Sequence, residues 1–111
     1  MIIEISTDRS IKWDEQREVQ FNAMIAERLD LYRTYIARIE VHLSDESLEK
    51  KKPRDIKCVL EANLQGFQQI SVTMRSDSEE LALLGAISKL SSSVKSTIDR
   101  ITEHRLYRDR R

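Results

Sequence analysis

The chain has 111 residues, which is enough for one ordinary domain and too short for two. Hydrophobic residues make up 40% and charged residues 34%, with only 2 Gly and 1 Pro, and this composition fits a folded, soluble protein rather than a disordered one. The 19 basic residues balance the 19 acidic ones, so the net charge indicates no class of partner.

A single cysteine, Cys58, excludes an internal disulfide and favours a reducing compartment. No apolar run approaches the roughly 20 residues that a membrane span needs. The first residues also lack the basic leader and the apolar length of a signal peptide. We therefore expect a cytoplasmic protein that does not bind membranes.

The first predicted elements are a strand and a helix. Three isoleucines within residues 1–7 predict the strand, because β-branched side chains suit a pleated sheet. Asp14 then offers a helix N-cap, and Trp13 is expected to pack back on the helix as a staple. Three-and-four spacing predicts a helix from about residue 14 to 31, with its apolar face formed by Phe21, Met24, Ile25 and Leu29.

Three further strands are predicted from alternating apolar residues within 37–43, 56–64 and 70–74. Cys58 falls in the buried register and is interpreted as a core thiol rather than a nucleophile. Gly66 stands where a hairpin between the last two strands needs positive φ. Residues 44–55 are predicted to form a charged loop, whose basic residues either remain solvated or meet an anionic surface.

The longest periodic segment predicts an amphipathic helix over about residues 78–103. A capping box is expected at its start, formed either by Ser76 with Glu79 or by Asp77 with Glu80. Gly85 and its alanine neighbours are small enough for the helix to lie close to the sheet. Residues 1–104 are expected to form one domain, and the basic residues 105–111 a frayed tail.

These elements predict an α+β fold in the order β-α-β-β-β-α. A right-handed crossover makes the first two strands parallel, and the remaining strands follow as an antiparallel meander. Each helix has one apolar stripe and each strand mostly one apolar face. We therefore expect a four-stranded sheet with both helices packed on one face.

Motifs for catalysis are missing from the sequence, so no enzymatic activity, cofactor or small-molecule substrate is expected. His42 and His104 have no ligand partner at metal-binding spacing, and neither glycine belongs to a phosphate-binding loop. The remaining class of function is binding of a macromolecule through the protein surface. The candidate RNA-binding residues are basic side chains on the two helices and the tail: Arg28, Lys89, Lys95, Arg100 and Arg105.

The chain resembles the ribosome hibernation promoting factor family, which includes the ribosome-associated inhibitor and the so-called sigma modulation proteins. The likeness covers about residues 1–102 and rests on the order of elements and on five short segments. These segments are residues 11–15 (IKWDE), Arg28-Leu29 before residues 39–43 (IEVHL), residues 76–78 (SDS) and residues 86–90 (AISKL).

The resemblance implies a factor on the small ribosomal subunit that covers the mRNA and tRNA channel and inhibits translation under stress. It also implies that basic residues of both helices bind ribosomal RNA, with Arg28 and Lys89 at family positions and Lys95 near another. Ser92 stands where the family usually has arginine. The chain is expected to be the short form, without the extra dimerising domain.

An alternative is a protein-interaction or regulatory domain that kept this fold and lost RNA binding. The neutral net charge and the acidic first helix favour it. Weak self-association through a sheet edge or the helix extension is a further expectation.

Overall fold

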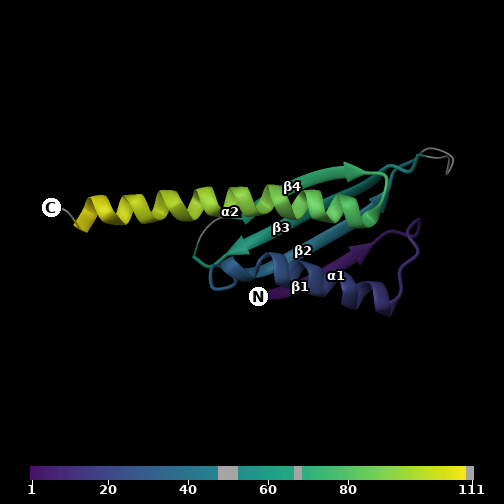
Figure 1. Ribbon diagram of the computed structural model, residues 1–111, viewed down its shortest axis with the longest axis horizontal. Coiled ribbons are helices and arrows are strands. Elements are labelled where there is room, and N and C mark those ends of the chain that lie inside the picture. The colour runs from purple at the N-terminus through teal and green to yellow at the C-terminus, as the bar shows by residue number, and fades with distance from the viewer. Residues whose placement is uncertain (48–52, 67–68, 110–111) are drawn as a thin grey trace.

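The structure is a computed structural model that describes residues 1–47, 53–66 and 69–109, with side chains described up to residue 103. Its elements are β1 (Ile2–Thr7), α1 (Glu15–Arg28), the 3-10 helix η1 (Asp30–Tyr32), β2 (Ile36–Asp45), β3 (Ile56–Leu64), β4 (Gln69–Ser76) and α2 (Glu79–Asp109). The predicted α+β class and its β-α-β-β-β-α order are confirmed (Figure 1).

The four strands form one sheet in the order β1-β2-β3-β4. β1 pairs with β2 in parallel, whereas the β2–β3 and β3–β4 pairs are antiparallel. Gly66 has a φ of 73° in the turn between β3 and β4, a conformation that glycine adopts without steric cost. The predicted parallel crossover and hairpin are therefore confirmed.

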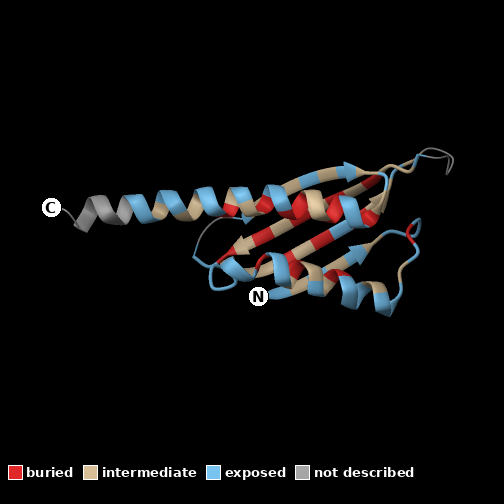
Figure 2. Cartoon of the chain, in the orientation of Figure 1, coloured by how far each residue is buried: buried red, intermediate tan, exposed pale blue. Residues whose placement is uncertain are grey.

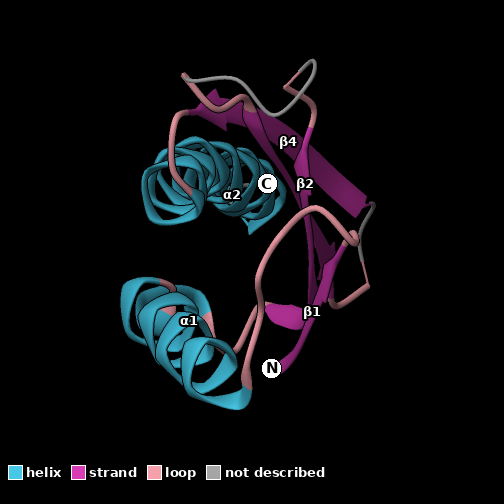
Figure 3. Cartoon of the chain, turned by 90° about the vertical axis from the view of Figure 1, so that its right-hand side faces the viewer, coloured by secondary structure: helices cyan, strands magenta, loops and turns pink. Residues whose placement is uncertain are grey.

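Both helices lie on one face of the sheet, as predicted (Figure 3). α2 contacts β3 and β4, while α1 contacts β1, the strand at the opposite edge of the sheet. The core lies between the layers, where β3 alternates between fully and partly buried residues (Figure 2). Cys58 belongs to this buried row, and burial raises the pKa of its thiol to about 12. Its predicted place in the core is confirmed.

α1 begins as predicted but ends earlier. The Asp14 side chain accepts a hydrogen bond of 2.8 Å from the Arg17 amide, and the Trp13 ring packs edge-on against Phe21 with centroids 4.9 Å apart. The predicted end near residue 31 is wrong, because Leu29 leaves helical geometry at φ −104° and ψ 9°. Its fully buried side chain anchors this end to the core, and η1 leads on to β2.

α2 begins one residue later than predicted and ends beyond the predicted limit. The Leu81 amide donates to Ser78 Oγ at 3.2 Å, so Ser78 caps the helix instead of either predicted capping box. The helix continues to Asp109, six residues beyond Glu103. Its 31 residues span about 46 Å, whereas the nine residues of β3 span about 30 Å, and α2 therefore extends past the sheet (Figure 1). Fraying of residues 105–111 stays a prediction.

Gly85 marks the closest approach of α2 to the sheet. A Cβ atom at this position would lie 2.7 Å from Cγ of Met74 on β4 and 2.8 Å from its Cε. The side chain of Met74 thus fills the space that any larger residue would need. The predicted role of Gly85 in close packing is confirmed.

We expect Gly85→Ala to lower the free energy of unfolding by about 1 kcal/mol, because overpacking against Met74 outweighs the gain in helix propensity. In a Met74→Ala background, the same substitution should stabilise the protein by about 0.5–1 kcal/mol. Urea denaturation of the four proteins in this cycle measures both effects. Stabilisation by Gly85→Ala in the wild-type background would contradict the close contact.

Candidate nucleic-acid interface and polar pocket

The structure does not bring the predicted RNA-binding residues together in one patch. Arg28 is exposed at the end of α1, whereas Lys89, Lys95 and Arg100 are exposed along α2. The Arg105 side chain lies outside the described residues. Because the sheet order places β1 and β4 at opposite edges, a residue on α1 and one beside β4 lie toward opposite edges of the same face of the sheet.

Two of these residues share the side of α2 that faces β4. Lys89 and Arg100 are eleven positions apart, which at 100° per residue places them within about 20° of each other around the helix. Lys89 Nζ donates a 2.9 Å hydrogen bond to the carbonyl oxygen of Thr73 on β4. Lys95 lies about 120° away from Lys89 around α2 and does not join this side.

A shallow groove of about 400 Å³, lined in part by Arg100, lies between α2 and the start of β4. Its lining is mostly hydroxyl and amide groups, from Gln69, Ile70, Ser92, Ser93, Ser96, Thr97 and Arg100. We call this groove, together with Lys89, the α2/β4 surface. Hydroxyl, amide and guanidinium groups are the donors that contact phosphates and ribose in RNA complexes.

The outward side of α1 has a different character. Its exposed residues include the acidic side chains of Glu15, Glu18 and Glu27, against the single exposed cation of Arg28. Arg17, the other basic residue of this helix, is partly buried and paired with Glu79. Among the described side chains, α2 carries three exposed cations, Lys89, Lys95 and Arg100, and also three exposed acids, Glu80, Asp99 and Glu103. α2 therefore offers more cations than α1 to a phosphate backbone, without an excess of positive charge over the whole helix.

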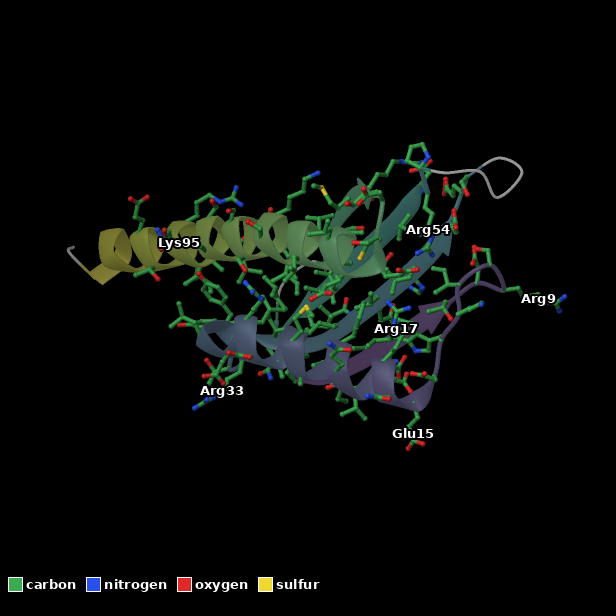
Figure 4. The ribbon with its side chains drawn as sticks, turned by 45° about the vertical axis from the view of Figure 1, so that its right-hand side comes forward. Arg9, Glu15, Arg17, Arg33, Arg54 and Lys95 are labelled. Carbon is green, nitrogen blue, oxygen red and sulfur yellow. The ribbon has the colours of Figure 1, made fainter. Side chains whose placement is uncertain are left out.

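A polar pocket of about 420 Å³ lies where the N-terminal ends of both helices approach the loops. It is lined by Ser10, Lys12, Arg17, Asp45, Ser47, Arg54 and Glu79. Glu79 is the buried acid of this group, with 4% of its side chain exposed. Arg54 forms an ion pair with Glu79 and also donates from Nη1 to its Oε2 at 3.2 Å, while Arg17 Nη2 lies 3.5 Å from the same oxygen. Figure 4 labels the two arginines, Arg17 on α1 and Arg54 on the segment before β3.

Burial on its own raises the pKa of Glu79, but hydrogen bonds from Arg54 and the backbone and the charges of Arg54 and Arg17 outweigh it. The pKa of this carboxyl therefore lies below its ordinary value, and Glu79 remains ionised. The Arg17 guanidinium also stacks 5.3 Å from the centre of the Trp13 ring. Glu79 on α2 forms ion pairs with Arg17 on α1 and with Arg54 on the loop before β3. These ion pairs connect the three segments to one another.

Sequence reasoning missed this cluster. Arg17 and Glu79 are 62 positions apart, and Arg54 and Glu79 are 25 apart, so no local spacing connects them. Arg54 was expected to be either a solvated loop charge or a contact to an anionic surface, and its pairing with a buried acid corrects that expectation. The neighbouring Lys50, Lys51 and Lys52 lie outside the described residues.

We expect Glu79→Gln to lower the free energy of unfolding by about 1–3 kcal/mol at pH 7, because the arginines lose their buried countercharge. A carboxyl whose pKa is lowered on folding stabilises the protein above its unfolded pKa of about 4.3, and this stabilisation is lost as pH falls through the folded value. The gap between variant and wild type should therefore close on acidification.

Denaturant unfolding at pH 7 and at about pH 3 measures this gap. Glu80→Gln, at the exposed neighbouring position, is the matched control and should change stability by less than about 0.5 kcal/mol. An equal loss in both variants, or a gap that does not depend on pH, contradicts the role of the cluster.

Within the described residues, no helix is both long and apolar enough to cross a membrane. The sequence matches no protein-family model, and it matches no curated protein sequence.

Solved structures do share this fold. The N-terminal domain of Thermus thermophilus Protein Y superposes with a TM-score of 0.69 at 20% identity, covering 87% of this chain and 99% of that domain. A ribosomal subunit interface protein from Coxiella burnetii also gives a TM-score of 0.69, at 15% identity, covering 89% of this chain and 99% of its own. The chain therefore has the fold of these proteins over nearly their whole length.

Proposed function

We propose that this protein is a non-enzymatic, cytoplasmic ribosome-associated factor that binds the small ribosomal subunit and inhibits translation under stress. The observation that carries the proposal is the match of fold to a ribosomal subunit interface protein over 99% of that chain. A second neighbour of the same fold, the Protein Y domain, is covered to the same extent. Inhibition by occupying the decoding region requires shape and affinity for folded RNA, and no reacting group.

The α2/β4 surface is the proposed contact with ribosomal RNA. Lys89 and Arg100 supply two cations on one side of a helix, and the hydroxyl groups between them can reach phosphate and ribose oxygens. Recognition of structured RNA by shape tolerates such a sparse, sequence-independent set of contacts. Arg28, Lys95 and Arg105 are proposed as additional contacts from outside this surface.

We expect the protein to co-sediment with small ribosomal subunits at low salt and to dissociate as salt rises, because phosphate contacts release counterions. Lys89→Glu and Arg100→Glu should each weaken binding and reduce the slope of log affinity against log salt by about one. Arg9→Glu is the matched control, since Arg9 is exposed at the far end of the molecule from Lys95 (Figure 4).

The control variant should bind like the wild type. If the protein sediments with small subunits no more than it does in their absence, at every salt concentration, the result contradicts ribosome binding. Loss of binding that is equal in all three variants contradicts the location of the contact and indicates a response to net charge alone.

Ser92→Arg offers a test by gain of binding. Ser92 lines the groove and is exposed, so an arginine there would add a third cation to the α2/β4 surface. We expect tighter co-sedimentation and a salt slope that is steeper by about one. Ser47→Arg, in the polar pocket, adds the same charge elsewhere. A similar gain in both variants contradicts the proposed surface.

The surface beside α1 supports a second candidate function, recognition of a protein partner. A groove of about 730 Å³ runs between β1 and α1, lined by Ile3, Glu4, Ile5, Glu18, Val19, Asn22 and Ala23. Val19 is 65% exposed beside it, and Ile2 on the neighbouring strand is 58% exposed. Apolar side chains mixed with carboxylates suit a protein partner better than a phosphate backbone.

Pull-down from a lysate with and without ribonuclease separates the two functions. Partners that persist after ribonuclease treatment and are lost in Val19→Asp support the protein-interaction domain. Partners that disappear with the RNA, and that are lost in Lys89→Glu, support the ribosome-associated factor.

A further inference from the structure

The face of the sheet that carries no helix has a row of three carboxylates. Glu4 on β1 pairs in register with Glu40 on β2, and Glu40 pairs with Glu61 on β3. Like charges directly opposite each other on neighbouring strands destabilise a sheet. Arg38 forms ion pairs with Glu4 at 2.5 Å and with Glu40 at 3.0 Å, whereas Glu61 has no cationic partner among the described residues.

His42 lies on the same face, two positions after Glu40 on β2, where its direct partner on β3 is Val59 and Glu61 is its diagonal neighbour. One ligand atom from each of Glu40, His42 and Glu61 lies within 4.8 Å of the other two. The two central strands of the sheet hold all three residues, so their backbone positions are fixed. Local spacing in the sequence did not indicate this group, because Glu61 comes from a different strand.

In each of the three side chains, one nitrogen or oxygen atom is hydrogen-bonded to a neighbouring side chain. The second nitrogen or oxygen atom of the same side chain can then coordinate a metal ion. Ser6 Oγ hydrogen-bonds His42 Nδ1 at 2.7 Å, which leaves Nε2 free to coordinate. Arg38 Nε donates to Glu40 Oε1 at 3.0 Å, and Gln69 Nε2 donates to Glu61 Oε2 at 2.8 Å. Hydrogen bonds of this kind orient metal ligands in proteins.

We propose that Glu40, His42 and Glu61 form a binding site for a divalent transition metal, with Zn²⁺ as the best fit and water in the remaining position. One imidazole and two carboxylates suit Zn²⁺, whereas Ca²⁺ needs six to eight oxygen ligands and Mg²⁺ prefers an octahedral oxygen shell. Bonds of about 2.1 Å place tetrahedral ligand atoms about 3.4 Å apart. Rotation of these solvent-accessible side chains can close the present separation.

Charge supports the same assignment. The three carboxylates and the single guanidinium of Arg38 leave a formal charge of −2, which one divalent cation neutralises. Cys58 cannot compete as a ligand, because it is fully buried on the opposite face of the sheet. Gln69, which also lines the α2/β4 surface, is the one residue that the two sites share. None of the three proposed ligands belongs to that surface, so metal binding can be tested without ribosomes.

Calorimetric titration of the untagged, chelator-stripped protein with Zn²⁺ at pH 7 tests the proposal. We expect saturable binding of one ion per chain and at least tenfold weaker binding of Mg²⁺. His42→Ala and Glu61→Gln should each weaken Zn²⁺ binding at least tenfold. Ser6→Ala should weaken it about 10- to 100-fold by releasing the imidazole.

His104→Ala is the matched control, because it removes the other histidine of the chain, which belongs to α2. Circular dichroism of each variant confirms that the fold is kept. Unchanged affinity in His42→Ala or in Glu61→Gln overturns the site, as does an equal loss in His104→Ala. Mg²⁺ binding as tight as that of Zn²⁺ overturns the assignment of the metal class.

Discussion

The structure depends on burying one apolar face of the two central strands. β2 and β3 carry fully buried side chains at alternate positions, and two helices are needed to cover them. Once α1 and α2 occupy this face, the polar residues of the strands are forced onto the other face. Two surfaces then remain available for binding partners. One is the outer sides of α1 and α2, and the other is the face of the sheet that carries no helix.

The periodic parts of the fold could be predicted from the sequence, because burial on one face imposes a period of two on strands and about 3.6 on helices. The ends of the helices could not. Leu29 ends α1 because its side chain is anchored in the core, and Ser78 rather than a capping box starts α2. Such ends depend on tertiary contacts that local patterns do not contain.

The candidate site was less predictable than the fold. The basic residues were identified as a set, yet strand order separates Arg28 from Lys89, since β1 and β4 lie at opposite edges. The cluster around Glu79 and the group around His42 join residues from different elements. Periodicity predicts which face a residue occupies, but only the assembled sheet determines its neighbours across strands.

A chain of zero net charge can still bind RNA if some of its cations gather on one side, and we propose Lys89 and Arg100 of the α2/β4 surface as such a pair. The most direct measurement is a cryo-electron microscopy reconstruction of the protein on the small ribosomal subunit. We expect Lys89, Arg100 and the hydroxyl groups of the α2/β4 surface to contact the RNA backbone, with the open face of the sheet turned away. RNA packed against that open face or against α1 alone would contradict this expectation.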